Sequence, residues 1–486
     1  MTEPNGTLYQ VSPEDMNLSG DEARLFNRLL AVWQSHLSGN VRNEAYYRGR
    51  VRPVTTDPGM PQELRNLDVV VGWGSKAVDA LAARSVFSAY DGGGADDLNA
   101  AIGELDMADL YAQAVTSELT DSCSFVTVSK GLAGEPDVIV SAHSALDAAA
   151  VWDERRKRVR AGICVVDIEE DESGYRVPTW VNMYTDSRTY SCRRRRGGTW
   201  VAESADNPLG RPLIEPLRYR PSLARPFGRS RITRTVRSLI DRAMCVAART
   251  ETSAVFYTYP QRYLLGVDRK TAESMAKSKV ETYVDRLLLV STNRNGDTPQ
   301  LGQLSQMTMQ PHMDHLETLA KQFASEASIP LDEVGIVFDN PSSADAMYSA
   351  QQRLIIEAEG VNRSNGIALR NVALMALACI RGTDIAGLSE EDREIRARFE
   401  NPMRPSMAAR ADYAIKVVSA VPAYASTAHF WRDLGYDEGE IRSIMADVRY
   451  AQAAEAVAQQ AAQQAAVTRA ATPTEGEGPT EGAEQA

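Results

Sequence analysis

Residues 225–256 read RPFGRSRITRTVRSLIDRAMCVAARTETSAVF. After Pro226-Phe227-Gly228, apolar residues recur every three or four positions, which is the spacing of one face of an amphipathic helix. This stripe comprises Ile232, Val236, Leu239, Ile240, Ala243 and Ala247. We therefore predict a helix from Gly228 to Phe256, at the point where the sequence pattern changes from strand to helix.

The same stretch is rich in arginine. Residues 225–242 contain one acidic residue, Asp241, and six arginines, which are Arg225, Arg229, Arg231, Arg234, Arg237 and Arg242. Guanidinium groups around a helix with one apolar stripe can bind phosphate, or can pair with acidic residues of a neighbouring subunit. The acidic surplus elsewhere in the chain favours pairing between subunits. The candidates for either role are Arg229, Arg231, Arg234, Arg237 and Arg242.

Upstream of this stretch, the sequence pattern is that of short strands. Between residues 125 and 200, runs rich in β-branched and aromatic residues alternate with turn residues. Amphipathic helices are predicted before these strands at Glu22–Trp33 and Gly74–Arg84, with a flexible glycine-rich connection at Asp91–Gly94. The arginine run 193–196 predicts a solvated hairpin tip, with a docking patch for an acidic partner or DNA as the alternative. The succession predicts an α+β fold.

Downstream, a mixed segment from Tyr257 to about Met309 precedes a second helix that ends before Pro330. The apolar face of that helix comprises Leu316, Leu319, Phe323 and Ala327. A loop at 330–343 and a long helix from about Ala344 to Ile380 follow. A last helical region ends in an Ala/Gln-rich segment. The stretch from Thr472 onward has Pro, Gly and Glu without a large apolar residue, which predicts disorder.

Composition and motifs argue against several classes of function. The formal net charge is −12, whereas a tight nucleic-acid binder normally carries a basic surplus. A protein that surrounds DNA without gripping it remains compatible with this charge. The five cysteines form no CxxC pair, no signal peptide is visible, and the apolar run Val372–Ile380 is too short to cross a membrane. We predict a protein that is not secreted and has no contact with a membrane.

No pattern for catalysis or metal binding stands out. The run VVVGWGSK at Val69–Lys76 lacks the glycine spacing of a Walker A loop, and GxSxG and HExxH motifs are absent from the sequence. His312 and His315 could in principle hold a metal ion, but an exposed polar helix face explains them better. We predict no catalytic residue, no metal and no cofactor.

A series of short motifs carries a family resemblance. They are Tyr46-Tyr47-Arg48-Gly49, Val70-Val71-Gly72-Trp73, Val151-Trp152-Asp153, Arg225–Ile232, Tyr259-Pro260-Gln261-Arg262 and Leu434-Gly435-Tyr436-Asp437. In this order they resemble the portal proteins of long-tailed phages, particularly those of actinobacterial phages. The resemblance extends to about residue 450, and the acidic tail matches no motif of the family.

The resemblance implies an α+β portal fold with an α/β wing, a helical stem, a small mixed α/β clip and a helical crown, which assembles as a dodecameric ring. The regions map onto this sequence with the following boundaries: 1–227 wing (helical start, β-rich second half), 228–256 first stem helix, 257–309 clip, 310–329 second stem helix, 330–343 tunnel loop, 344–470 wing-spanning helix and crown, 471–486 disordered acidic tail.

The implied function is a ring-shaped channel at one capsid vertex, through which double-stranded DNA is packaged and later ejected. The implied partners are further copies of the chain, the terminase large subunit, the major capsid and scaffolding proteins, and a head-tail adaptor. The expected location is the virion, with the host cytoplasm during assembly. Another head-assembly or adaptor protein is the alternative within phage particles. A nucleotide-driven DNA motor is the alternative enzyme, against which the missing Walker A loop argues.

The tunnel loop supplies the candidates for contact with DNA. It is bounded by Pro330 and Pro341 and has acidic residues but no basic residue, so it should repel phosphate and let the duplex slide. A short buried strand through Val334, Ile336 and Phe338 is the alternative. The candidate channel residues are Asp332, Glu333, Phe338, Asp339 and Asn340.

Overall fold

The computed structural model describes residues 16–52, 68–102, 105–131, 134–170, 176–195, 198–258, 262–265, 300–303, 308–336, 344–403, 407–436 and 438–471. The chain divides into two units, Met1–Pro402 and Met403–Ala486. The mixture of helices and antiparallel sheets in the first unit confirms the predicted α+β class.

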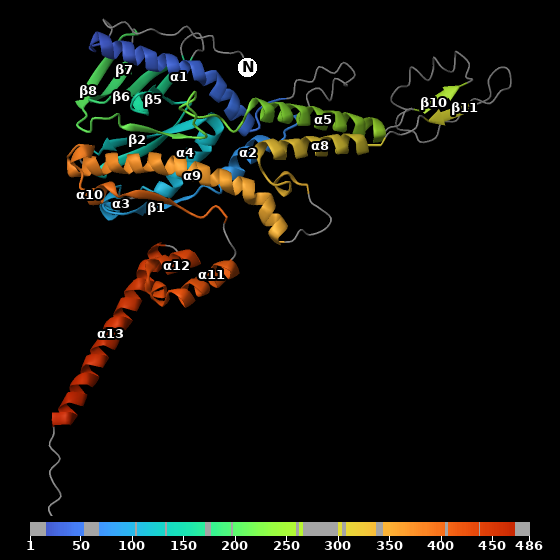
Figure 1. The fold of residues 1–486 in the computed structure, drawn as a ribbon. Helices are drawn as coiled ribbons and strands as arrows, with labels where there is room; N and C mark the ends of the chain where they lie inside the picture. Colours follow the sequence, from blue (N-terminus) through green and yellow to red (C-terminus); the bar gives the residue numbers. More distant parts are fainter. Residues whose placement is uncertain are drawn as a thin grey trace, which may run out of the picture. The chain divides into compact units, whose positions relative to one another are not determined.

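A five-stranded antiparallel sheet forms one layer of the first unit (Figure 1). Its strands follow one another in chain order: β4 (Ala148–Asp153), β5 (Arg158–Glu170), β6 (Arg176–Tyr184), β7 (Arg188–Arg194) and β8 (Trp200–Asp206). The antiparallel pairing of β7 with β8 confirms the predicted hairpin at the arginine run. Within the run, the Arg193 guanidinium lies over the ring of Trp180, 4.1 Å from the centroid. Arg196 lies outside the described residues.

Helix α1 (Gly20–Tyr47) covers one face of this sheet. Its first turn is fixed by a capping box, in which Ser19 and Glu22 each bind the other's backbone N–H. Phe26, Leu29 and Trp33 are buried against the sheet, and the Trp33 indole N–H donates to the Leu146 carbonyl at 2.7 Å. The predicted helix at Glu22–Trp33 is therefore confirmed, and it extends to Tyr47.

A three-stranded sheet in the order β3-β2-β9 contributes to the main hydrophobic core. Its strands are β2 (Cys123–Lys130), β3 (Val138–Ser144) and β9 (Ile214–Arg218). Helices α2 (Trp73–Ala82), α3 (Ala95–Ile102), α4 (Met107–Asp121) and α9 (Ala344–Arg381) contribute to the same core. The long helix α9 confirms the prediction from its sequence.

The predicted flexible connection at Asp91–Gly94 is wrong. Strand β1 (Phe87–Asp91) pairs with β12 (Arg396–Phe399), and the glycines that follow pack against the segment around the short helix α10 (Glu390–Arg393). A Cβ atom on Gly93 would overlap the Glu391 carbonyl oxygen. The glycines therefore permit close backbone packing. A glycine-rich composition is equally compatible with a flexible segment and with a closely packed one, so the sequence alone does not separate the two.

Helices α5 (Arg234–Thr258) and α8 (Gln310–Ala327) pack side by side and run in opposite directions (Figure 1). Beyond them, β10 (Arg262–Leu265) and β11 (Gln300–Gln303) form an antiparallel pair. The predicted start of the first helix at Gly228 is wrong, because α5 begins at Arg234. The Thr233 hydroxyl accepts from the Val236 N–H at 3.2 Å and so caps the start of the helix.

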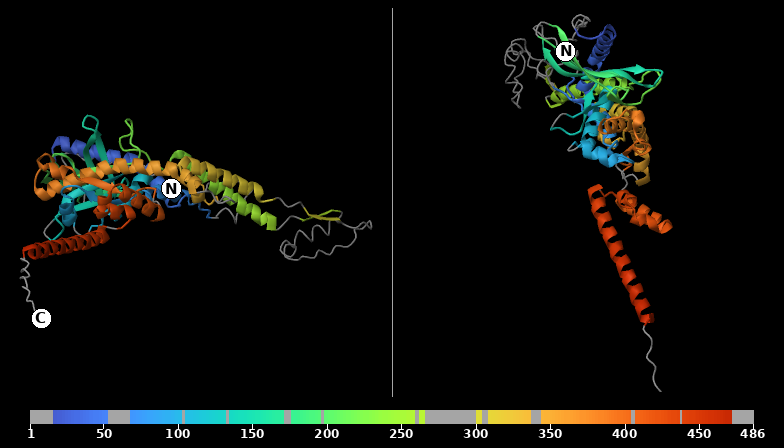
Figure 2. Two further views of the ribbon diagram at one scale, coloured as in Figure 1. Left: turned by 60° about the horizontal axis from the view of Figure 1, so that its bottom comes forward. Right: turned by 90° about the vertical axis from the view of Figure 1, so that its left-hand side faces the viewer.

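The second unit is helical. It contains α11 (Met407–Ala420), α12 (Ala428–Leu434) and α13 (Glu438–Ala471). Figure 2 shows α13 as a long continuous helix. Thr427 caps the start of α12, and Gly435, with φ +102°, ends it in the left-handed conformation that favours glycine. The Ala/Gln-rich part of α13 is exposed over residues 451–463. The predicted disordered tail, from Thr472 onward, lies outside the described residues.

Candidate functional site

The segment that connects β9 to α5 positions the α5–α8 helix pair. Gly228 has φ +78°, and a Cβ atom there would overlap the Tyr219 carbonyl oxygen. The Arg229 N–H donates to that carbonyl at 2.9 Å, and the Ser230 hydroxyl donates to the Thr120 carbonyl. The connection therefore passes close against β9 and the end of α4, which only glycine at this position allows.

Arg231 joins three helices at the base of the helix pair. It is 5% exposed, and its guanidinium donates to the carbonyl oxygens of Ala77 on α2 and Ala327 on α8. It also forms an ion pair with Glu357 of α9, with 2.8 Å between Nη1 and Oε2. Arg231 does not fit the predicted contact with phosphate or a neighbouring subunit, because its guanidinium is enclosed by partners within its own chain.

Glu357 is the buried acidic partner in this network. Tyr219 donates to Glu357 Oε1 at 2.6 Å, and Arg220 forms a further ion pair with the same oxygen. Burial alone would raise the pKa of Glu357, but the charge of Arg231 and the hydrogen bonds from Arg231 and Tyr219 hold the pKa below its ordinary value. The carboxylate is therefore charged at neutral pH and matches the Arg231 charge.

Above this base, the two helices share an apolar seam. Val236, Leu239 and Ala243 of α5 and Phe323 of α8 are buried, and the ring of Phe323 stacks on Trp73 with 4.9 Å between the centroids. The seam corresponds to the predicted apolar stripes, so the helices pair through the faces that the sequence indicates.

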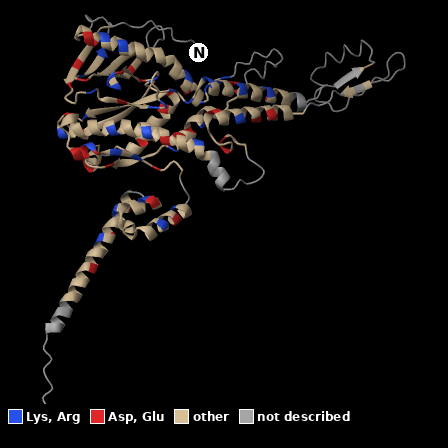
Figure 3. Ribbon diagram, viewed as in Figure 1, with Lys and Arg blue, Asp and Glu red and all other residues tan. Residues whose placement is uncertain are grey.

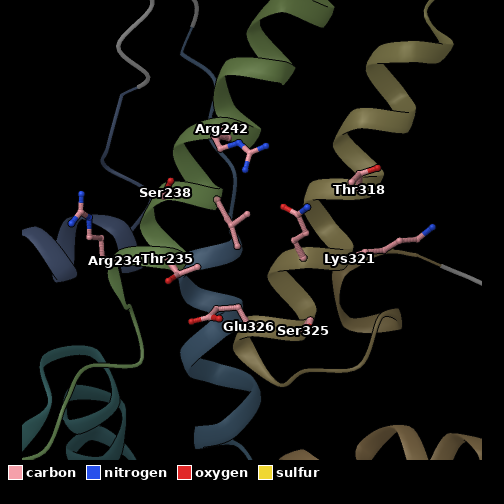
Figure 4. Close-up of a pocket in the computed structure, with 10 residues that line it drawn as sticks. Arg234, Thr235, Ser238, Arg242, Thr318, Lys321, Ser325 and Glu326 are labelled. Atoms are coloured by element: carbon pink, nitrogen blue, oxygen red, sulfur yellow. The ribbon is translucent and has the colours of Figure 1, made fainter.

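An open groove of about 760 Å³ runs along the exposed side of the pair. It is lined by Arg234, Ser238 and Arg242 from α5 and by Thr318, Lys321 and Glu326 from α8, among others. Arg242 reaches into the gap between the helices, whereas Arg234 points away from α8 (Figure 4). Lys321 is paired with Glu317 at 2.6 Å.

The two helices differ in charge. The exposed acidic residues Asp314, Glu317 and Glu326 lie on α8, while Arg234, Arg242 and Arg249 are exposed on α5 (Figure 3). Charges of opposite sign on the two helices of one chain can pair when two copies stand side by side, because each copy then offers the complement of its neighbour.

Comparison with known proteins identifies the family. A family model described as "Phage portal protein, SPP1 Gp6-like" matches residues 121–429, from the end of α4 to the start of α12. The chain belongs to this family. The portal protein of Mycobacterium phage D29 is 25% identical over 438 residues, which cover 86% of this chain and 87% of that protein. The portal protein of Mycobacterium phage L5 is 24% identical over 437 residues, with the same two shares.

Among solved structures, this portal chain is similar to chains of gene transfer agent particles. A chain of the virion of a native particle covers 84% of this chain and 99% of its own length, at a TM-score of 0.42 and 13% identity. A chain of the neck of the native particle, computed with C12 symmetry, covers 82% and 98%, at a TM-score of 0.41 and 14% identity.

The remaining arginine candidates of this portal chain have different surroundings. Arg237 is half-buried and donates to the Asn43 side chain on α1 at 2.9 Å, so it ties α5 to its own chain. Arg229 is exposed and precedes α5, so it lies outside the helix in which the sequence pattern places it. Arg234 and Arg242 are exposed on α5 and line the groove.

The predicted tunnel loop is described only in part. Asp332 and Glu333 lie in a single 3-10 turn, and Glu333 approaches Lys76 with 3.7 Å between Oε2 and Nζ. Val334 belongs to the same turn and packs against the main core, so the alternative of a strand starting at Val334 is wrong. Phe338, Asp339 and Asn340 lie outside the described residues.

The metal hypothesis at His312 and His315 gains no support. His312 Nε2 lies 3.0 Å from the Ser253 hydroxyl, which joins α8 to α5. Among the described residues, there is no cluster of three or more His, Cys, Asp or Glu side chains with the arrangement of a metal site. None of the helices in the described ranges has the length and apolarity that crossing a bilayer requires.

Sequence reasoning missed Glu357 and Tyr219, the partners of Arg231. A signal was present for Glu357, because it lies between Leu354, Ala358 and Val361 on the apolar face of a predicted helix. An acidic residue in such a position requires a buried cation or donor. No pattern in the sequence indicates that this cation is Arg231, more than a hundred residues away.

Proposed function

We propose that the chain is a phage portal protein that forms the ring-shaped channel through which double-stranded DNA is packaged into the capsid and later ejected. The match of the family model over residues 121–429 carries this proposal, since it includes both helices of the α5–α8 pair. In this role the protein is structural and not an enzyme, and it belongs to the virion after assembling in the host cytoplasm.

The ring is a dodecamer in which the α5–α8 pair forms the stem. The exposed arginines Arg234 and Arg242 of one copy face the acidic residues of α8 in the next copy. Opposite charge on the two helices supports this arrangement, as does the seam that leaves their outer faces free for a neighbour. The alternative role of these arginines, contact with phosphate, would add friction to a polymer that must slide.

The remaining regions follow in the order that the sequence predicts. The segment 257–309, between the two stem helices in sequence, is the clip and docks the terminase large subunit and later the head-tail adaptor. Asp332 and Glu333 belong to the loop that borders the channel, with Phe338, Asp339 and Asn340 beyond them. The wing meets the major capsid and scaffolding proteins, and 344–470 forms the wing-spanning helix and the crown.

Native mass spectrometry of the purified chain tests the proposal. A closed oligomer with a copy number of twelve is expected at low micromolar concentration. A chain that remains monomeric over a wide range of salt and protein concentration would contradict it. An ATP hydrolysis assay of the same sample separates a structural ring from a nucleotide-driven motor, and measurable turnover would overturn the structural role.

A further inference from the structure

A rigid turn at residues 220–226 presents a leucine to solvent. Ser222 and Arg225 exchange two backbone hydrogen bonds, each 3.0 Å long, and Pro221 and Pro226 bracket them. Leu223 lies at the tip of the turn and is 91% exposed. The turn is therefore held in one shape while its apolar tip contacts solvent.

The base of the turn is anchored on both sides. Before it, the Tyr219 N–H donates to the Ser122 carbonyl at 3.1 Å. After it, the Phe227 ring packs against Trp152 and Phe125, with centroid separations of 5.9 Å and 6.1 Å. Because both ends are fixed, little conformational freedom remains to be lost when a partner covers Leu223.

A single exposed leucine is ordinary on a protein surface. This one is adjacent to a pocket of about 710 Å³ between α1, the start of β2, β4 and residues 224–230. Arginine side chains from three elements line the pocket, namely Arg42, Arg225, Arg229 and Arg237. In the described part of the chain, the guanidinium groups of Arg225 and Arg229 have no hydrogen-bond or ion-pair partner.

Asp121 also lines the pocket. It is 3% exposed, and its Oδ1 atom has no hydrogen-bond partner within the described ranges. Burial raises the pKa of Asp121 to about 8, with contributions from the negative charges of Glu44 and Asp147. The carboxyl group is therefore largely protonated at neutral pH, does not cancel the charge of the arginines, and can donate a hydrogen bond to an anionic group.

We infer that the Leu223 turn and this arginine-lined pocket receive an acidic surface of the next copy of the chain in the ring. The inference rests on the proposed ring assembly and identifies a contact outside the stem. The chain contains 65 acidic and 53 basic residues, so a second copy carries a surplus of the charge that complements the pocket. Arginine is enriched in protein–protein interfaces, and the buried centre of such interfaces is apolar, which suits Leu223.

Double-stranded DNA fits this site less well. A pocket of this size admits side chains but not a duplex, and phosphate contacts with DNA come from charges spread along a surface. The apolar tip at Leu223 gains nothing from a phosphate backbone. A protein surface, in contrast, can bury the leucine and pair with the arginines at once.

Two variants test the inference. Leu223→Asp places a charge where an apolar contact is expected, and Arg225→Glu with Arg229→Glu reverses the charge at the rim. Each should raise the protein concentration at which rings dissociate by about tenfold or more, because losing one buried leucine or a charged pair at each contact has an effect of this size. Analytical ultracentrifugation of the full chain measures that concentration.

Matched variants separate the contact from an effect on folding. Leu223→Met retains the apolar tip, and Arg225→Lys with Arg229→Lys retains the charge, so both should assemble nearly as the parent chain does. Arg155→Glu reverses the charge of one arginine in an exposed turn of the five-stranded sheet and should leave assembly unchanged. Circular dichroism confirms that every variant is folded.

Three outcomes would count against the inference, and they differ in what they say of the proposed function. If the parent chain forms rings and both test variants form them equally well, the inference is wrong and the proposed function stands. If the parent chain forms no ring, the proposed function and the inference fail together. If ring formation is unchanged but retention of duplex DNA is lost in the Arg225→Glu, Arg229→Glu variant, the pocket binds DNA and the second-copy contact is wrong.

Discussion

Arg231 illustrates how a surface-like sequence motif can hold a buried residue. Within the run Arg229-Ser230-Arg231, one arginine is exposed and the other is enclosed by carbonyl oxygens and Glu357. This motif, one of those that carry the family resemblance, therefore contributes packing at the base of the α5–α8 pair as well as charge. Its effect on stability can be measured directly.

Replacing Arg231 with methionine removes the cation and leaves the buried Glu357 carboxylate without its closest charged partner inside the core. Breaking a buried pair on one side costs about 3–5 kcal/mol of unfolding free energy. Arg234→Met, three residues later and exposed on α5, should change it by less than about 0.5 kcal/mol. Urea unfolding followed by tryptophan fluorescence compares the two, and equal small effects would show that the network contributes little.

Glu118 is a second buried acidic residue, and its effect depends on pH. It is 0% exposed, it accepts from Asn365 Nδ2 at 2.6 Å, and burial raises its pKa to about 8. Between the ordinary pKa near 4.5 and 8, the unfolded chain releases the proton that the folded chain keeps. The unfolding free energy should therefore fall as pH rises through this window, by up to about 1.4 kcal/mol per pH unit.

Glu118→Gln replaces the carboxyl group with an amide, which does not titrate in either the folded or the unfolded chain. The variant should show a shallower fall in unfolding free energy from pH 5 to pH 8 than the parent chain, whatever constant offset the new amide introduces. Urea titrations at several pH values give the two slopes. If the unfolding free energy of both proteins falls equally with pH, the pKa of Glu118 is not raised in the folded state. Glu118 would then be charged there and stabilised by contacts other than those described.

At the scale of elements, the stripe of apolar residues predicts the existence of α5 but not where it begins. The first member of the stripe, Ile232, is buried before the helix starts, because the chain follows β9 and α4 until Thr233 caps α5. The spacing of apolar residues indicates which positions are buried. Buried positions also occur in the non-helical connection before α5, so the spacing does not fix where the helix begins. The same limitation explains the glycines at 92–94, whose composition predicts flexibility and which the structure packs closely.

The candidate site is predictable only in part for a related reason. Exposure of Arg234 and Arg242 follows from their positions opposite the apolar stripe on α5. The burial of Arg231 and the contact of Arg237 with α1 depend on elements that are distant in sequence, and no local pattern reports them. One sequence therefore predicts which residues carry charge, but not which charges pair over a long range.

Gly228 determines how the strand layer connects to the helix pair. Alanine there would overlap the Tyr219 carbonyl oxygen in a left-handed backbone conformation. Gly210 also has positive φ, +65°, but a Cβ atom at Gly210 would have no neighbouring atom within 4 Å. Gly210→Ala should cost about 1–2 kcal/mol from backbone conformation alone, and Gly228→Ala about 1–3 kcal/mol more from the clash.

Thermal unfolding of the two alanine variants measures this difference. A lower Tm for Gly228→Ala than for Gly210→Ala is expected, because only Gly228 of the two is crowded by a neighbouring backbone. Equal Tm values would indicate that the connection between β9 and α5 relaxes freely, and that the base of the α5–α8 pair is less constrained than the contacts suggest.

At the scale of the whole molecule, an acidic chain is suited to surround DNA without retaining it. The net charge of −12 disfavours tight binding of a polyanion. The acidic tail from Thr472 has no large apolar residue in its sequence, so its removal should leave the ring intact. Size-exclusion chromatography of a chain ending at Ala471 checks this, and loss of the ring would show that the tail contributes to assembly.

The central claim is that copies of this chain form a ring around an open channel. Electron microscopy of the purified full-length chain tests it most directly, because averaged end-on views report both the symmetry of the assembly and the presence of the channel. We expect closed twelvefold rings with a central opening wide enough for a DNA duplex. Discrete particles without a through-channel, or monomers at every concentration, would contradict the claim.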